Sequence, residues 1–299
     1  MPVISASRRT DIPAIYGAWF MDKIAKGECR VTNPFNGKVD TVSLRLADVD
    51  GIVFWSRNYH PMIANLKRLH DMGYRFYCHF TINGYPRFLE RSSPSVNLAM
   101  KTAHELCNLF GPKTVVWRYD PIILTSATDA QWSLRNISMI ADGLKGATDT
   151  CVISFVDWYR KVDRNLIPVL ERRGLVAQTP SAEEMAALAG AMAESVRSRG
   201  MELLACCEPD VESHTIRRSA CVDPVRLSQV TGKDLRRLPP APTRAGCGCK
   251  ASRDIGAYDT CPLGCAYCYA SRSRELSLTR MKATQTGDMT LGGVKENFT

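Results

Sequence analysis

Short apolar runs alternate with stretches of helical periodicity over roughly the first 210 residues, and this alternation limits the fold more than any other feature. The apolar runs lie at 2–7, 51–56, 74–82, 114–122, 149–158 and 201–209, and the helical patterns lie at 14–27, 61–73, 94–111, 129–146 and 181–200. The runs are short, rich in β-branched residues and largely unalternating, which is typical of strands covered on both faces. The chain is therefore predicted to be an α/β protein with a parallel sheet.

The number of βα units narrows the architecture. Six units are too few for a closed eight-stranded barrel, and they fit a partial (β/α)6 barrel of the TIM type or a doubly wound sheet. We expect the partial barrel, over residues 1–220. From 221 onwards proline, glycine and charge replace periodicity, so 221–299 is predicted to be an irregular, cysteine-rich segment that packs on the barrel mouth. Its end, 287–299, is expected to be a loosely ordered tail.

Two helix starts carry a local signature. Ser181 with Glu184, and Thr128 with Gln131, have the spacing of a capping box, in which the first side chain and the fourth each bond the other's backbone N–H. The sequence therefore predicts helices that begin at these residues.

Charged side chains follow the predicted strands. They include Arg8, Asp11, Arg118, Asp120 and Glu208. Ligands of parallel α/β folds bind at the carboxyl ends of the strands. These residues are therefore candidates for binding a cofactor and a substrate, although an ion pair that fastens strand ends is an alternative for each arginine–aspartate pair.

The charge and the absent motifs limit the class of protein. A formal net charge of +9 favours an anionic or small-molecule substrate, and nucleic acid is one such partner. No apolar run reaches the ~18 residues of a membrane span, and no signal-like stretch opens the chain, so we expect a cytoplasmic protein. The phosphate-loop, dinucleotide-fold and nucleophile-elbow motifs do not occur.

The cysteines are the strongest functional signal. The chain has 12, and in a long chain without a signal peptide these favour metal or redox chemistry over disulfides. Four stand alone, whereas eight fall between 206 and 268. Three of these eight, Cys261, Cys265 and Cys268, form C-x3-C-x2-C in "CPLGCAYCYA".

Three thiolates at this spacing predict a metal site with one open position. Zinc in a structural site takes four protein ligands, and a cubane iron–sulfur cluster is normally held by four cysteines. A [4Fe–4S] cluster on Cys261, Cys265 and Cys268 leaves one iron without a protein ligand, as a cluster that performs chemistry requires. A zinc site made from Cys247, Cys249 and two of the three is an alternative.

Five further cysteines precede the motif and could hold a second metal. They are Cys206, Cys207, Cys221, Cys247 and Cys249. No compact motif joins them, so packing in the core is the alternative.

The motif, with the aromatic Tyr267 before its last cysteine, resembles the signature of the radical S-adenosylmethionine superfamily. The resemblance implies that S-adenosylmethionine binds the open iron, and that an electron from a donor such as a flavodoxin or ferredoxin cleaves it to a 5'-deoxyadenosyl radical. It also implies a role for Tyr267 at the cofactor. In that superfamily the motif usually follows the first barrel strand, whereas here it follows the last βα unit.

The chain as a whole resembles the family called domain of unknown function 1848, at Ile4–Ala14 and at Cys247–Ala270. That family is described as having a radical-SAM-like cysteine cluster at its C-terminus. We therefore expect a radical-SAM-like enzyme whose last loop folds back to the rim that contains Arg8, Asp11, Arg118 and Asp120. A nucleic-acid-binding or repair protein with a structural or redox cluster, and a structural zinc-binding protein, are the alternatives.

Overall fold

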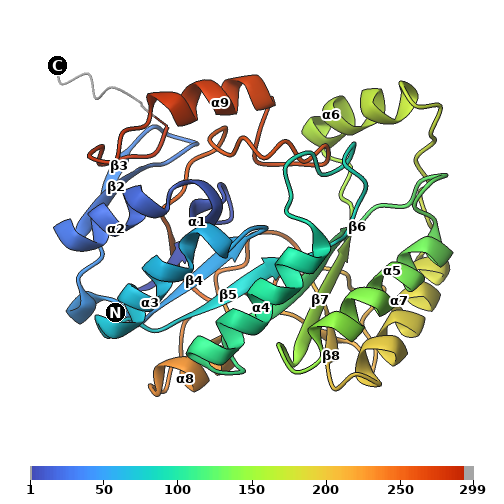
Figure 1. The fold of residues 1–299 in the computed structure, drawn as a ribbon, viewed down its shortest axis with the longest axis horizontal. Helices are drawn as coiled ribbons and strands as arrows, with labels where there is room; N and C mark the ends of the chain where they lie inside the picture. Colours follow the sequence, from blue (N-terminus) through green and yellow to red (C-terminus); the bar gives the residue numbers. More distant parts are fainter. Residues whose placement is uncertain (1, 293–299) are drawn as a thin grey trace.

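The computed structural model describes residues 2–292 and contains one eight-stranded parallel sheet (Figure 1). Across the sheet the strands are β10 (Arg253–Asp254), β1 (Val3–Ala6), β4 (Gly51–Ser56), β5 (Phe76–Thr81), β6 (Val115–Ile122), β7 (Thr150–Phe155), β8 (Glu202–Ala205) and β9 (Arg217–Arg218). Every neighbouring pair is parallel. The predicted α/β class and all six predicted strands are confirmed, and the short edge strands β9 and β10 were not predicted.

Helices cover one face of this sheet. The α-helices are α1 (Ile12–Ile15), α2 (Gly17–Lys26), α3 (Ile63–Asp71), α4 (Val96–Phe110), α5 (Ala130–Leu144), α6 (Arg160–Glu171), α7 (Ala182–Arg197), α8 (Pro224–Thr231) and α9 (Arg274–Ala283). Figure 1 shows α3, α4, α5 and α7 side by side in front of the strands. Between these two layers lies the main core, in which Phe54 packs edge-on against Phe20 and Phe76 at ring distances of 5.4 and 5.6 Å.

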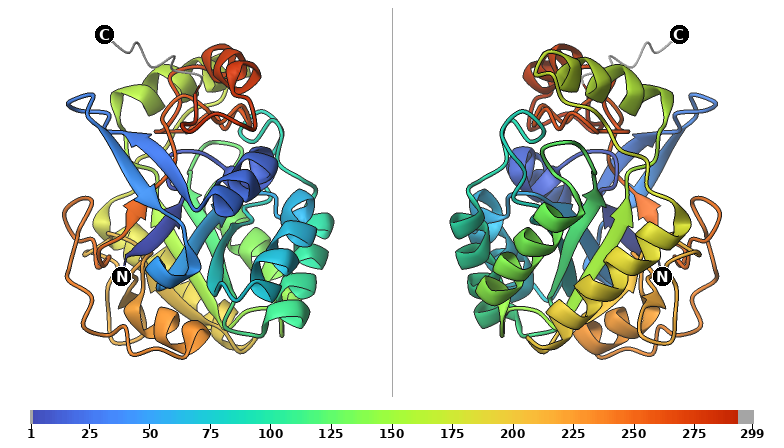
Figure 2. Two further views of the ribbon diagram at one scale, coloured as in Figure 1. Left: turned by 90° about the vertical axis from the view of Figure 1, so that its left-hand side faces the viewer. Right: turned by 90° about the vertical axis from the view of Figure 1, so that its right-hand side faces the viewer.

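Residues 221–250, which include α8, cover the other face (Figure 2). A second core forms there between alternate strand residues such as Val53 and Val116 and the segment's Val222, Leu227 and Leu235. The strand order follows the chain from β1 to β8 without a reversal. The doubly wound alternative is therefore wrong, because it requires such a reversal. Within residues 2–292 the edge strands β10 and β9 do not pair, so the sheet is open.

An antiparallel hairpin that was not predicted, β2 (Glu28–Thr32) and β3 (Val39–Ser43), follows α2. Two 3₁₀ helices, η1 (Leu46–Asp48) and η2 (His60–Met62), complete the elements. The hairpin and α2 hold the segment after α9. The Arg30 N–H donates to the Met289 carbonyl at 2.9 Å, and the Trp19 indole donates to the Asp288 carbonyl at 2.7 Å. The expected loose tail is therefore wrong for 287–292, and 293–299 lie outside the described residues.

One predicted helix start is confirmed and the other is wrong. The Ser181–Glu184 capping box forms in both directions. At the start of α5, Asp129 is the N-cap and accepts from the Trp132 N–H at 2.7 Å, while Thr128 turns away to bond the Ile123 carbonyl. No helix within residues 2–292 is long and apolar enough to cross a membrane.

Candidate metal centre

Asp254 brings the cysteine motif to the carboxyl end of the sheet. It lies on β10, and its carboxylate accepts hydrogen bonds from the Ser5 hydroxyl (2.7 Å), the Ser7 hydroxyl (2.6 Å) and the Arg8 N–H (3.0 Å). The chain then passes so close to Ser7 that a Cβ on Gly256 would lie 2.0 Å from the Ser7 Oγ. A side chain there would collide, so only glycine permits this close approach.

The motif loop then folds back over the strand ends. The Tyr269 hydroxyl donates to the Arg8 carbonyl at 2.6 Å, and the Ala266 N–H donates to the Leu89 carbonyl at 2.9 Å. The Tyr16 hydroxyl, from the start of α2, fixes the Thr260 carbonyl at 2.6 Å. These contacts place the motif loop beside Arg8, at one end of the predicted rim.

The three motif cysteines are free thiols that influence one another. Burial raises the pKa of Cys261 well above its ordinary value, and the nearby Asp11, Cys268 and Cys265 raise it further. Burial also raises the pKa of Cys265 to about 12, although the neighbouring Arg57 guanidinium opposes the shift. Without a metal these two thiols stay protonated at neutral pH, so a bound cation must displace their protons.

Behind the motif lies a buried polar network around Glu90. Its Oε1 accepts from the Arg57 Nη1 (2.6 Å), the Asn83 amide (3.0 Å) and the Tyr267 hydroxyl (2.5 Å). The Arg57 guanidinium also lies 5.3 Å from the centre of the Tyr267 ring. Tyr267, predicted to contact the cofactor, is thus bonded through its hydroxyl to the chain's own carboxylate.

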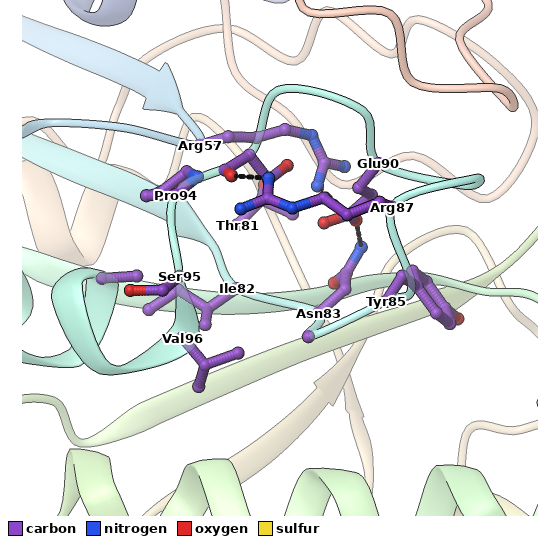
Figure 3. Close-up of a pocket in the computed structure, with 13 residues that line it drawn as sticks. Arg57, Thr81, Ile82, Asn83, Tyr85, Arg87, Glu90, Pro94, Ser95 and Val96 are labelled. Carbon is purple, nitrogen blue, oxygen red and sulfur yellow. Dashed lines mark hydrogen bonds and ion pairs between the residues drawn. The ribbon is translucent and has the colours of Figure 1, made fainter.

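A cavity of about 490 Å³, which includes space open to solvent, adjoins this network (Figure 3). Residues from the end of β5 and the loop that follows line it, among them Asn83, Tyr85, Arg87 and Glu90, together with Arg57 from the end of β4. No sequence pattern marked Glu90, because it is a single carboxylate in an irregular loop.

Asp11 lies on the motif side of the rim. It caps α1, accepting from the Ala14 N–H at 3.0 Å, and it also accepts from the Ser56 hydroxyl (2.6 Å) and the Arg57 N–H (2.8 Å). Burial raises its pKa to about 6 despite these hydrogen bonds. Its oxygens therefore fasten the ends of β1 and β4 together.

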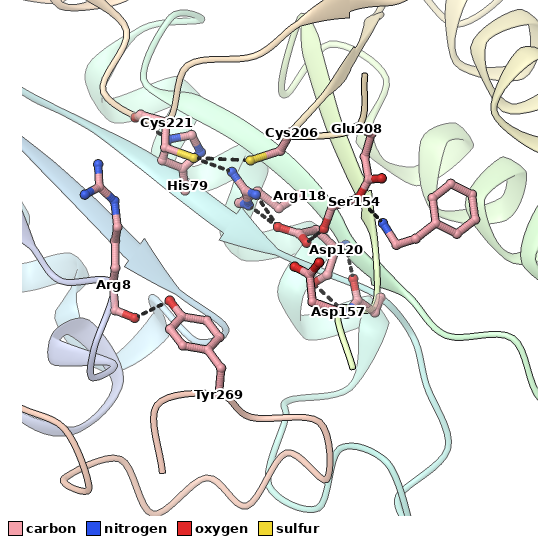
Figure 4. Close-up of polar contacts among 12 residues, drawn as sticks. Arg8, His79, Arg118, Asp120, Ser154, Asp157, Cys206, Glu208, Cys221 and Tyr269 are labelled. Atoms are coloured by element: carbon pink, nitrogen blue, oxygen red, sulfur yellow. Dashed lines mark hydrogen bonds and ion pairs between the residues drawn. The ribbon is translucent and has the colours of Figure 1, made fainter. Parts of the chain in front are cut away.

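Arg118, Asp120 and Glu208 lie on the other side of the rim (Figure 4). The Arg118 Nε donates to the Asp120 Oδ2 at 2.6 Å, and its Nη1 lies 3.2 Å from the Cys221 Sγ. Glu208 accepts from the Phe155 N–H at 2.9 Å, and burial raises its pKa to about 7, with Asp120 adding to the shift. The residues of the predicted rim therefore do not form one site. Asp11 lies beside the motif cysteines, whereas Arg118 lies beside Cys206 and Cys221.

The five earlier cysteines are brought together there. The Cys206 and Cys221 sulfurs lie 3.7 Å apart, and the Cys221 N–H donates to the Cys249 sulfur at 3.2 Å. Cys207 and Cys247 are close enough to influence the pKa of Cys206 and of Cys249, respectively. We call this group the cysteine ring, and Cys261, Cys265 and Cys268 the motif triad. The four sulfurs of the predicted mixed zinc site are not assembled, since no three His, Cys, Asp or Glu side chains of residues 2–292 are arranged to hold one metal ion.

The model of one protein family, a domain of unknown function (DUF1848), matches residues 3–270 of the chain. The match begins at β1 and ends just after the motif triad, so it contains the whole sheet and both groups of cysteines. Among curated proteins, none matches the sequence.

Proposed function

Because the chain belongs to the DUF1848 family, whose description names no activity, we propose its function from the site: an iron–sulfur enzyme of the radical S-adenosylmethionine type. In this proposal Cys261, Cys265 and Cys268 hold one [4Fe–4S] cluster, and S-adenosylmethionine occupies the open iron. The observation that carries the proposal is the position of the motif triad. It is anchored through Asp254 over the carboxyl ends of parallel strands, beside a cavity.

The residues present fit a cubane cluster. A single zinc ion needs ligands that converge on one point, whereas a cubane binds each thiolate through a different iron. Three free thiols that interact without forming a single-ion group therefore suit the cluster. The Arg57 guanidinium beside Cys265 would offset part of the added negative charge.

The sheet also supports the finer description of a partial (β/α)6 barrel. Its six predicted strands are consecutive neighbours, and the helices that join them lie on one face. We therefore propose that the sheet corresponds to a sector of a TIM barrel.

The bound cluster would supply one-electron reduction of S-adenosylmethionine. The chain's own residues hold and orient the parts. The Glu90 network fixes Tyr267 and therefore the loop between Cys265 and Cys268. Arg57 and Arg87 line the adjoining cavity, which favours an anionic substrate. A reduced ferredoxin or flavodoxin would supply the electron.

Anaerobic reconstitution with iron and sulfide tests this function. We expect Cys265→Ala to lose about four irons per chain and to abolish release of 5'-deoxyadenosine from S-adenosylmethionine by the reduced protein. Cys107→Ala, on α4, is the matched control and keeps both. Full iron content and full activity in Cys265→Ala would rule the proposal out, and one tightly held zinc in place of iron would favour the zinc alternative.

Nucleic acid is the second candidate partner, and one cavity favours it. Arg9, Arg30 and Arg280 line this cavity together with Tyr258, and the Arg9 guanidinium lies 5.3 Å from the centre of the Tyr258 ring. Arginines beside an aromatic ring suit a phosphate and a base. A salt-sensitive complex with a short single-stranded oligonucleotide, weakened by Arg9→Gln, would support this partner, and equal binding by both proteins would exclude the cavity.

A further inference from the structure

We propose that the cysteine ring binds a second iron–sulfur cluster, held entirely by protein thiolates. This inference goes beyond the function proposed above and does not depend on it, because it concerns different residues. Four of the five thiols are enough to give every iron of a cubane a protein ligand. Such a cluster has no open iron, so its chemistry is limited to electron transfer or to stabilising the fold.

The geometry of the ring is the first argument. The Cys206 and Cys221 sulfurs are 3.7 Å apart, and the Cys221 N–H donates to the Cys249 sulfur at 3.2 Å. Cys207 and Cys247 lie beside this group, where Cys207 influences the pKa of Cys206 and Cys247 that of Cys249. The five cysteines are therefore gathered in one place, although they come from three separate parts of the chain.

The sheet holds two of these three parts in place. The Cys206 N–H continues the ladder from β8 to the Ile153 carbonyl of β7 at 2.8 Å. The Cys221 carbonyl accepts from Tyr77 and contacts the His79 Nε2 at 2.7 Å, both on β5. The third part is held within the irregular segment, where the Cys249 carbonyl accepts from the Ala241 N–H at 2.9 Å. Cys206 and Cys221 are therefore positioned by rigid elements, as a metal centre requires.

Positive charge beside the ring is the second, independent argument. Arg118 donates to the Cys221 sulfur at 3.2 Å, and the Arg8 guanidinium interacts with Cys221 and Cys249. The Nη2 of Arg8 is buried without a hydrogen-bond partner. A buried donor of this kind is normally paired. Asp120 balances the charge of Arg118. The Nη2 of Arg8 remains without a partner, and a negatively charged, thiolate-bound cluster would supply one.

The ring offers one thiol more than a cubane takes. Each thiolate of a cubane binds a different iron, so its sulfurs lie about 6 Å apart. Because the Cys206 and Cys221 sulfurs are 3.7 Å apart, this pair would supply one ligand. The other three ligands would come from Cys207, Cys247 and Cys249. A [4Fe–4S]²⁺ core delivered on four external thiolates exchanges them for four cysteine thiolates, and the external thiolates leave as thiols with the four cysteine protons. The oxidation state of the core does not change in this step.

Reconstitution of full-length variants with iron and sulfide separates the two sites. Cys261→Ala/Cys265→Ala/Cys268→Ala removes the motif triad, and we expect it to retain about four irons and four sulfides with visible charge-transfer absorbance. Adding Cys221→Ala/Cys249→Ala should remove them. If the triad variant binds no iron, the second cluster is overturned and the first stands. If it keeps all the iron of the unmodified protein, the first cluster fails and the second stands.

Counting the paramagnetic centres of the unmodified protein gives a second measurement that does not depend on whether the variants fold. After reduction we expect two paramagnetic centres per chain, and a single centre that disappears with the motif triad contradicts the proposal. A disulfide between Cys206 and Cys221 in protein prepared without oxygen, or one zinc lost with Cys221→Ala/Cys249→Ala, also overturns it. Cys107→Ala is again the control and leaves both centres unchanged.

Discussion

At the scale of single residues, the buried pair of Arg57 and Glu90 has a large energetic consequence. Their side chains are 13% and 4% exposed and meet at 2.6 Å. Removal of one partner from such a pair leaves a charge in a poorly solvated position, which costs more than the intact pair contributes.

Glu90→Ala is therefore expected to lower the free energy of unfolding of the metal-free protein by about 3–5 kcal/mol, measured by urea denaturation. In the double variant with Arg57→Met the loss should be much smaller, because no charge is left unpaired. The exposed Glu194→Ala on α7 is the control and should stay within about 0.5 kcal/mol. A loss in the double variant equal to the sum of the single losses would contradict this account.

Asp149, which lies just before β7, gives a pH dependence at the amino end of the sheet. Burial alone would raise its pKa, but hydrogen bonds from Arg226, at 2.8 Å, and from Lys113 outweigh burial and lower the pKa to about 2. A carboxyl group with a lowered folded-state pKa stabilises the fold above its unfolded pKa of about 3.9. That stabilisation is lost as the pH falls towards 2.

We expect Asp149→Asn to be less stable than the unmodified protein at pH 7, and the difference to shrink between pH 4 and pH 2. Urea unfolding at a series of pH values measures this. A difference that stays constant across that interval would show that the hydrogen bonds, rather than the charge, stabilise the fold.

The residues of the motif triad could be predicted because their spacing is local, and the same holds for the arginines and aspartates after each strand. Glu90 could not be predicted, since only its partners from three elements distinguish it from any loop glutamate. Tyr267 could be predicted because it stands next to the last cysteine of the motif. Its hydrogen-bond partner, Glu90, could not be predicted, because only the fold brings the two residues together.

At the scale of elements, β10 and Gly256 determine where the last loop lies. The two-residue strand sets the register with β1, and Gly256 allows the chain to pass Ser7. A methyl group there must displace Ser7 and thus the Asp254 contact.

Gly256→Ala is expected to cost about 1–3 kcal/mol through overpacking and to reduce the iron bound by the motif triad. Gly287→Ala is the matched control, because a Cβ at that position would have nothing within 4 Å. Thermal unfolding and iron analysis of both proteins check the prediction. Equal stability in the two variants would mean that the loop at Gly256 moves to accommodate the methyl group without lowering the free energy of unfolding.

Helices and strands could be predicted where their sequences are apolar, and the polar strands were missed. Six strands and the start of α7 were found because apolar runs and a capping box are local signals. The hairpin of β2 and β3 was missed because its sequences, "ECRVT" and "VDTVS", are polar and short. The start of α5 was misassigned by one residue, since Asp129 competes with Thr128 for the cap.

At the scale of the whole molecule, the two faces of the sheet are covered by different kinds of structure. Helices lie on one face, whereas residues 221–250 lie on the other and bury Val53, Tyr77 and Val116. The composition change at 221 marks where regular elements end. Nothing local in the sequence indicated which face the irregular segment covers, or that Cys221 would meet Cys206.

A fragment of residues 1–220 is therefore expected to aggregate or to bind a hydrophobic dye strongly, because one face of its sheet is uncovered. Co-expression with the remainder of the chain, 221–299, should restore solubility. A monomeric 1–220 fragment with cooperative unfolding would instead support an independent domain.

The pairing of β1 with β10 also concerns the order in which the protein is made. Strand β1 must wait for a neighbour that is synthesised about 250 residues later. At roughly 5–20 residues per second that delay is on the order of ten seconds or more. The Asp254 contacts, and the cysteines they position, form only after β10 has been made. The iron proposed for the motif triad would therefore find a finished site only after Cys268 has been synthesised. Products cut short before β10 would leave the edge of β1 open to other strands.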